Sequence, residues 1–100
     1  MKNLFDMNGL VAVVTGAGGA MGSVIAEGLA EYGANVVVIG HKNRGRIPKT
    51  LDTIKSYGKK AFECYCDVTS QDDVDRAVQA TIDEFGRVDV YINCPGYSFR

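Results

Sequence analysis

The stretch from Leu10 to Gly22, LVAVVTGAGGAMG, decides the fold. It begins with five apolar residues, Leu10–Val14, a pattern typical of a strand that is buried on both faces of a sheet. The glycine-rich segment Thr15–Gly22 ends this run. The residues from Ala20 to Tyr32 then follow helical spacing, and Gly33 is placed to end that helix. The stretch therefore predicts a strand, a tight glycine turn and a helix in direct succession.

Apolar runs and amphipathic segments continue to alternate along the rest of the chain. Further strands are predicted at Asn35–Ile39, Ala61–Cys66 and Val88–Asn93, and further helices from near Pro48 to Gly58 and from Ser70, as N-cap, to Gly86. The apolar positions near helical spacing are Met21, Val24, Ile25, Leu29 and Tyr32 in the first helix, Ile47, Leu51 and Ile54 in the second, and Val74, Ala77, Val78, Thr81, Ile82 and Phe85 in the third. Strands separated by helices of this length form a parallel sheet through right-handed crossovers, so we expect an α/β fold.

Composition places the chain among single globular domains, with 100 residues, 46% hydrophobic and 23% charged, and a net charge of −1. This balance argues against a disordered chain and against a basic nucleic-acid-binding protein. The charge is uneven: residues 1–60 carry eight Lys or Arg and four Asp or Glu, whereas residues 61–100 carry three and eight. Twenty residues between Asp6 and Glu27 carry no charge, but five glycines interrupt them, so no membrane contact is expected.

The three cysteines, Cys64, Cys66 and Cys94, are an odd number and form no disulfide framework. With a single histidine they are too few for a zinc site, so no metal is expected. Cys64 and Cys66 lie on one face of the predicted strand, where we interpret them as core residues. Cys94 is interpreted as a small buried apolar residue. Reduced thiols of this kind favour a cytoplasmic location.

The glycine segment has the chemistry of a phosphate-binding loop. Glycines let an anion approach the backbone, and the helix that follows offers unpaired N–H groups and a partial positive charge. Two common phosphate motifs do not fit: Met21 occupies the third glycine position of G-x-G-x-x-G, and no Gly-Lys-Ser/Thr follows the loop. A plain strand-to-helix turn is the alternative.

The segment Thr15–Gly22 resembles the T-G-x-x-x-G-x-G loop of the short-chain dehydrogenase/reductase family, with Ala20 in place of the middle glycine. It also fits T-G-x-x-G-x-x-G, the variant of the extended branch that includes nucleotide-sugar epimerases. Asp67-Val68 and Asn93-Cys94-Pro95-Gly96 follow the third and fourth predicted strands, where the family has an Asp and an N-N-A-G segment. The lead Phe85–Asp89 resembles that of the classical branch, which we therefore favour.

The resemblance implies a Rossmann-like parallel sheet with helices on both faces, four strands in the order 3-2-1-4, and a dinucleotide at their ends. Asp67 would accept a hydrogen bond from the adenine amino group, with a turn cap as the alternative. Asn93–Gly96 is alternatively a plain turn. The candidate cofactor-binding residues are Gly16, Gly18, Gly19, Met21, Gly22, His41, Lys42, Arg44, Asp67, Val68, Asn93, Cys94, Pro95 and Gly96.

The tip of the second predicted strand favours NADP(H) over NAD(H). An NAD site usually has a carboxylate there, but this chain has Gly40 and no Asp or Glu before Asp52. The basic residues His41, Lys42 and Arg44 follow instead, and they would pair with a 2′-phosphate. A merely solvated loop is the alternative, and NAD is not excluded.

Members of this family transfer a hydride between a nicotinamide and a small carbonyl or alcohol, using a Ser, a Tyr and a Lys four residues after the Tyr. None of the five tyrosines here has a Lys at that spacing, so no catalytic residue is assigned. We interpret residues 1–100 as the NAD(P)-binding portion of an oxidoreductase, truncated before the catalytic half. A catalytically inactive nucleotide-binding fragment, or a fragment of an extended-branch epimerase or dehydratase, is the alternative.

The start of the sequence bears on the substrate, and the fourth predicted strand bears on the assembly. The opening LFDMNG resembles the lead of sugar-acid and polyol dehydrogenases, and keto-acyl reductases are nearly as close. The fourth predicted strand would leave an unpaired apolar edge, and we expect a homo-oligomer.

Overall fold

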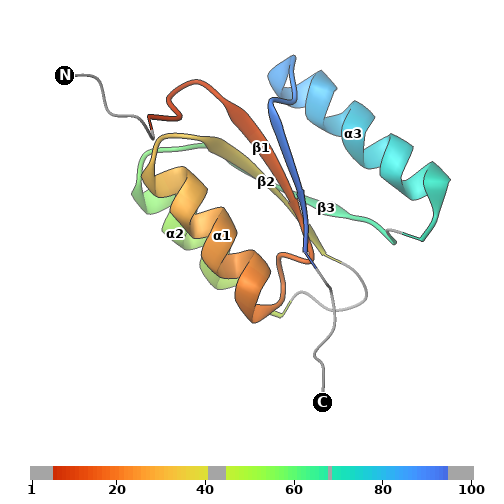
Figure 1. The fold of residues 1–100 in the computed structure, drawn as a ribbon, viewed down its shortest axis with the longest axis horizontal. Helices are drawn as coiled ribbons and strands as arrows, with labels where there is room; N and C mark the ends of the chain where they lie inside the picture. Colours follow the sequence, from red (N-terminus) through yellow and green to blue (C-terminus); the bar gives the residue numbers. More distant parts are fainter. Residues whose placement is uncertain (1–5, 41–44, 68, 95–100) are drawn as a thin grey trace.

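The computed structural model describes residues 6–40, 45–67 and 69–94. Within these ranges strands and helices alternate as β1 (Val11–Thr15), α1 (Ala20–Glu31), β2 (Asn35–Gly40), α2 (Ile47–Ser56), β3 (Ala61–Tyr65), α3 (Gln71–Phe85) and β4 (Val90–Asn93). The strands form one parallel sheet in the order β3-β2-β1-β4 (Figure 1). The predicted α/β fold and strand order are confirmed, with element ends shifted by one or two residues.

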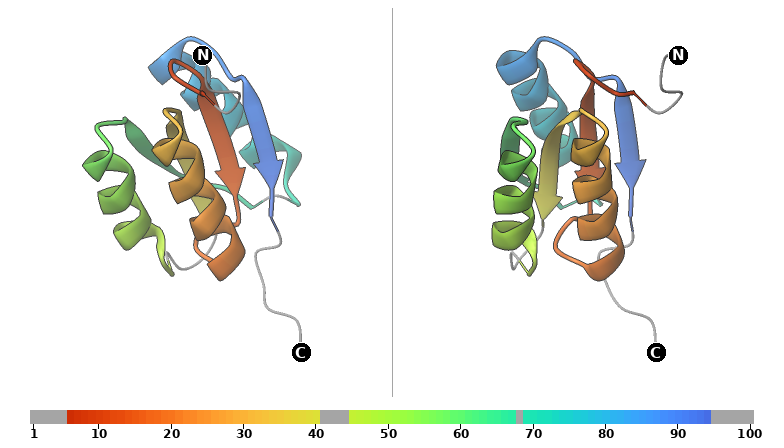
Figure 2. Two further views of the ribbon diagram at one scale, coloured as in Figure 1. Left: turned by 60° about the vertical axis from the view of Figure 1, so that its left-hand side comes forward. Right: turned by 90° about the vertical axis from the view of Figure 1, so that its left-hand side faces the viewer.

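Helices cover both faces of the sheet, with α1 and α2 on one side and α3 on the other (Figure 2). Alternate residues of β1 and β2 enter two separate cores. Ala12, Val14, Val36 and Val38 pack with the α1 and α2 side, and Val11, Val13, Val37 and Ile39 pack with the α3 side. This explains why both strands are continuous apolar runs rather than alternating ones.

The buried face of α1 consists of small residues. The residues of α1 that are buried are Gly22, Ser23, Ala26 and Ala30. Met21 and Val24 are 65% exposed, and Tyr32 is exposed as well, whereas Ile25 and Leu29 are partly buried against the core. The helical spacing of Met21, Val24 and Tyr32 thus marks the helix but not its buried face, which small residues form. The physical reason is close approach, because a helix packed tightly on a sheet needs small side chains at the contact.

The ends of α3 match the sequence signals, but its apolar face is narrower than predicted. The hydroxyl of Ser70 accepts a hydrogen bond of 3.3 Å from the Asp73 amide, and Gly86 ends the helix in the left-handed region. Ala77 is buried and Val74 and Phe85 are partly buried, whereas Ile82 is exposed. Only part of the predicted face thus contacts the sheet.

Asp89 attaches the start of β4 to the start of β1. Its Oδ2 accepts a hydrogen bond of 2.8 Å from the Val11 amide, and its own amide donates one of 2.9 Å to the Val11 carbonyl. Arg87 donates to Oδ1 at 2.7 Å. Both strands therefore begin at a defined register, which also determines where they end.

The described part of the chain contains neither a candidate membrane-spanning helix nor a candidate metal site. No helix there has both the length and the apolar character needed to cross a bilayer. Nor do three or more His, Cys, Asp or Glu side chains gather, in those same ranges, into a candidate metal site.

Candidate functional site

The carboxyl ends of the four strands lie along one edge of the sheet. Thr15 pairs with Ile39 on one side and with Asn93 on the other, and Gly40 pairs with Tyr65. In open parallel sheets, ligands bind outside this edge. The segments that follow β1, β2, β3 and β4 are therefore the candidate site.

The loop after β1 is a tight turn that requires glycine at two positions, Gly16 and Gly22. Gly16 has a φ of +66°, and its carbonyl accepts a hydrogen bond of 3.1 Å from the Gly19 amide. A Cβ at Gly22 would overlap the carbonyl oxygen of Gly16, closer than van der Waals contact allows. The Ala17 amide also donates to Ile39 at 3.1 Å, which attaches the loop to the end of β2.

The start of α1 is suited to an anion. Its N-cap, Gly19, has extended backbone angles and offers no side-chain cap, and the first turn contains no acidic residue. The first amides of a helix lack partners within the helix and carry its partial positive charge. A Cβ at Gly19 would meet the Gly16 oxygen at an ordinary 3.6 Å, so the backbone on this side is open. The residues present therefore fit a phosphate group.

A hydrogen bond joins this loop to the segment before α2. The Arg46 amide donates to the Gly18 carbonyl at 3.0 Å. His41, Lys42 and Arg44, the predicted 2′-phosphate residues, lie outside the described residues.

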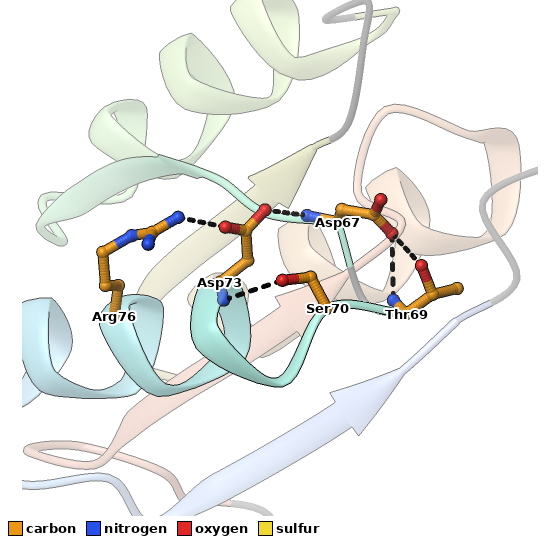
Figure 3. Close-up of polar contacts among 5 residues, drawn as sticks. All are labelled: Asp67, Thr69, Ser70, Asp73 and Arg76. Atoms are coloured by element: carbon orange, nitrogen blue, oxygen red, sulfur yellow. Dashed lines mark hydrogen bonds and ion pairs between the residues drawn. The ribbon is translucent and has the colours of Figure 1, made fainter.

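Asp67 follows β3 and closes a turn (Figure 3). Its Oδ1 accepts hydrogen bonds from the amide and the hydroxyl of Thr69, at 2.9 and 2.6 Å. Its amide donates to Asp73 at 3.0 Å, and Asp73 also pairs with Arg76. The turn-capping role that the sequence left open for Asp67 is thus present, and the adenine contact stays a prediction. Val68 lies outside the described residues.

The two cysteines at the end of β3 are core residues, as predicted. Cys66 is buried and Cys64 is partly buried, both on the α3 side of the sheet. Burial raises the pKa of the Cys66 thiol, and the nearby Asp73 and Asp67 carboxylates raise it further. Burial also raises the pKa of Cys64. Both thiols therefore stay protonated at neutral pH, which makes them poor nucleophiles.

Thr15 connects the ends of β1 and β4, a role that the sequence analysis missed. Its hydroxyl donates a hydrogen bond of 2.6 Å to Asn93 Oδ1 and accepts one of 3.2 Å from the Cys94 amide. The only sequence signal for it was its place as the first residue of the loop motif. Cys94 is buried, as predicted. Pro95 and Gly96 lie outside the described residues.

The structure describes the positions of some candidate site residues, and the others stay predictions. The structure brings the glycine loop, Gly40, Asp67 and Asn93 to one edge of the sheet. Met21 lies in the first turn of α1 and is exposed. What this arrangement can do chemically is to bind an extended anionic ligand across several strand ends.

Comparison with known proteins gives a consistent result. Residues 10–99 match the family model described as short chain dehydrogenase. The chain is 36% identical over 90 residues to the 7alpha-hydroxysteroid dehydrogenase of Escherichia coli strain K12. The aligned region covers 90% of this chain and 35% of that protein. It therefore spans about a third of the length of this curated relative.

Two solved structures are similar in fold and sequence. An NAD+-bound xylitol dehydrogenase superposes with a TM-score of 0.83 at 36% identity, covering 91% of this chain and 35% of that one. The NADPH-dependent 3-quinuclidinone reductase of Rhodotorula rubra superposes with a TM-score of 0.81 at 33% identity, covering 88% of this chain and 33% of that one.

Proposed function

Because the chain belongs to the short-chain dehydrogenase family, we propose that it is the dinucleotide-binding part of an NAD(P)-dependent oxidoreductase. The reaction proposed for the whole protein is hydride transfer between the nicotinamide and a small carbonyl or alcohol. The observation that carries the proposal is the strand, glycine turn and helix in which Gly22 packs on the Gly16 carbonyl. This contact brings an uncapped helix N-terminus to the carboxyl edge of the sheet.

The test places a charge on the loop without disturbing the fold. Gly22 is unsuitable, because a side chain there would overlap the Gly16 backbone. Gly19 has room and is the N-cap of α1, and Asp and Asn are equally good N-cap residues. Gly19→Asp and Gly19→Asn therefore form a matched pair that differs in charge alone.

We expect Gly19→Asp to lose NADP+ binding in isothermal titration calorimetry, because its carboxylate repels the phosphates of the dinucleotide. Gly19→Asn should bind at least tenfold more tightly than Gly19→Asp, a difference of about 1.4 kcal/mol. Thermal unfolding without ligand should show both variants at least as stable as the parent. Equal affinity of the two variants would contradict a phosphate site at this loop.

The candidate residues would bind different parts of the dinucleotide. Asp67 and Val68 would hold the adenine, and Asn93, Cys94, Pro95 and Gly96 would border the middle of the cofactor. Gly16, Gly18, Gly19, Met21 and Gly22 would hold its phosphates. The nicotinamide ring, when bound, accepts or donates the hydride.

We propose a preference for NADP(H). Support comes from Gly40, which ends β2 where an NAD-selective site would have a carboxylate, and from the basic residues His41, Lys42 and Arg44 that follow it. The relatives include an NAD+-bound enzyme and an NADPH-dependent one, so the family accommodates both cofactors. Tighter binding of NAD+ than of NADP+ would contradict this proposal.

The proposed substrate and location are general. A sugar acid, a polyol or a keto-acyl group fits the proposed chemistry, and one similar structure is a xylitol dehydrogenase.

The free thiols Cys64, Cys66 and Cys94 suit a reducing compartment, and the location proposed is cytoplasmic. Recovery of the tagged protein in a membrane or secreted fraction would contradict this location.

A further inference from the structure

Asp67 lies where the chain leaves the sheet, and the hydrogen bonds of its backbone lead to α3. The residue before it, Cys66, still donates its amide to the Gly40 carbonyl of β2, at 2.9 Å. The Asp67 carbonyl accepts a hydrogen bond of 2.8 Å from the Ser70 amide, and the Asp67 amide donates one of 3.0 Å to Asp73 Oδ2 (Figure 3). The direction in which Asp67 leaves the sheet is therefore determined by the start of α3.

The Asp73 side chain makes a contact that the usual helix cap does not include. In a capping box, the side chain three positions after the N-cap bonds back to the N-cap amide. Here the Ser70 amide donates to the Asp67 carbonyl, and the Asp73 carboxylate instead reaches the Asp67 amide, three residues before the N-cap. The Ser70 hydroxyl still caps the helix, since it accepts a hydrogen bond of 3.3 Å from the Asp73 amide. The contact between the Asp73 carboxylate and Asp67 is therefore additional to the cap.

Both oxygens of the Asp73 carboxylate are bonded. Oδ2 accepts from the Asp67 amide, and Oδ1 pairs with Arg76, which lies one turn further along α3. The Asp73 side chain is 15% exposed, whereas the Arg76 side chain is 72% exposed. A hydrogen bond from an amide to a carboxylate is shorter and stronger than one between neutral groups. Asp73 therefore holds the Asp67 amide more firmly than a backbone carbonyl would.

The Asp67 carboxylate is oriented by its own turn. Its Oδ1 accepts hydrogen bonds from the amide and the hydroxyl of Thr69, at 2.9 and 2.6 Å. These bonds orient the carboxylate relative to the turn, but the turn itself is attached to α3 through Asp73. The position of the Asp67 carboxylate at the edge of the sheet therefore depends on Asp73.

We propose that Asp73 is a positioning residue for the cofactor, which holds Asp67 where its carboxylate accepts a hydrogen bond from the adenine amino group. The inference rests on the proposed function, since it takes Asp67 as the adenine contact. A carboxylate only accepts hydrogen bonds, so it favours the amino group of adenine over the carbonyl oxygen that hypoxanthine has at the same position. Asp73 thereby determines how strongly the site distinguishes the two bases.

The test compares the affinities of NADP+ and nicotinamide hypoxanthine dinucleotide phosphate for the whole chain, measured by isothermal titration calorimetry. The two probes differ only at the edge of the base, where a carbonyl oxygen replaces the adenine amino group. A general loss of folded protein lowers the apparent affinity for both probes and leaves the ratio of the two affinities unchanged. This ratio therefore reports on the position of Asp67 and not on stability.

We expect the parent to bind NADP+ about tenfold or more tightly than the hypoxanthine dinucleotide, the usual effect of a hydrogen bond to a charged group. Asp73→Ala should reduce this ratio to about threefold or less, because the Asp67 amide loses its partner. Asp73→Asn should give an intermediate ratio, since its amide oxygen still accepts a hydrogen bond but carries no charge.

Asp72→Ala is the matched control. Asp72 also lies in the first turn of α3 and is exposed, so its replacement removes the same charge from the same helix N-terminus. The ratio of affinities in Asp72→Ala should stay within about twofold of that in the parent, as expected for an exposed charge. Thermal unfolding without ligand, followed by circular dichroism, shows whether each variant is folded.

Two results would overturn the inference and leave the proposed function standing. The first is a parent that distinguishes the two bases together with an Asp73→Ala variant that does so equally well. If Asp73→Ala does not fold, an unchanged ratio in Asp73→Asn has the same meaning. The second is an equal loss in Asp73→Ala and Asp72→Ala, because the effect would then belong to the charge at the helix end.

Two other results would reach the proposed function itself. If the parent binds both probes equally well, the adenine contact of Asp67 fails and the inference fails with it, while dinucleotide binding stands. If the parent binds neither probe, the proposed function fails as a whole.

Discussion

Single polar side chains join strands that are far apart in the sequence. The Thr15 hydroxyl bonds to Asn93 at the carboxyl ends of β1 and β4, and the Asp89 carboxylate bonds to Val11 at their amino ends. Both contacts hold β4 against β1 in register. Because β4 ends at Asn93, these contacts also determine where that strand ends relative to the candidate site.

The Asp89 carboxylate makes stability depend on pH. The hydrogen bond from Arg87 lowers the pKa of this carboxyl below 3.8, and the Val11 amide lowers it further. A carboxyl whose pKa is depressed on folding contributes its stability above the unfolded pKa. That contribution is lost as the pH falls through the folded pKa.

We expect Asp89→Asn to lower the melting temperature at pH 7 and to reduce the loss of stability between pH 5 and pH 3. The reason is that the amide neither attracts Arg87 nor titrates. Thermal unfolding followed by circular dichroism at the three pH values measures both effects. Asp52→Asn, an exposed carboxyl on α2, is the control. The same pH dependence in Asp89→Asn and the parent would contradict this role.

The β4 strand lies at one edge of the sheet, and β3 lies at the other. Within the described residues β4 pairs with β1 alone. Tyr91, whose register partner Val13 lies in the α3-side core, is 44% exposed. Edges of this kind are ready to pair with another strand.

We expect the chain to self-associate through β4, because pairing there satisfies the free backbone groups of the edge. Tyr91→Lys should shift the chain toward monomer in analytical ultracentrifugation, since a charge on an edge strand opposes pairing. Tyr57→Lys is a matched control, because Tyr57 is also 44% exposed but lies at the end of α2. A monomeric parent, or an equal effect of the two variants, would contradict this interface.

At the scale of the whole molecule, the fold gathers residues that are far apart in the sequence into one candidate site. The glycine loop, Gly40, Asp67 and Asn93 lie at one edge of the sheet. No Tyr in the given sequence is followed four residues later by Lys, which is the spacing that the family resemblance implies for proton exchange during hydride transfer.

We therefore expect the purified chain to bind NADP+ without turning it over. The measurement is NADPH absorbance with a panel of polyols and sugar acids, and the reverse reaction with carbonyl compounds. A full-length relative serves as the positive control. A rate above the protein-free background would show that other residues of this chain carry the chemistry.

The local features of the fold were predictable because they depend on neighbouring residues. The apolar run of β1, the glycine turn, the Ser70 cap and the Gly86 stop are each encoded within a few positions, and the structure confirms them. The strand order followed from the resemblance to a family with that topology, and the structure confirms it as well.

The sequence by itself determined which elements form and that a glycine turn follows the first strand. Tertiary structure alone decided which face of α1 is buried, that Thr15 meets Asn93, and that Arg46 lies against Gly18. The physical reason is that hydrophobic periodicity acts along one element, whereas these contacts depend on how closely two backbones approach. That distance selects small residues such as Ala26 over larger apolar ones such as Val24, and it is set only once the layers have packed.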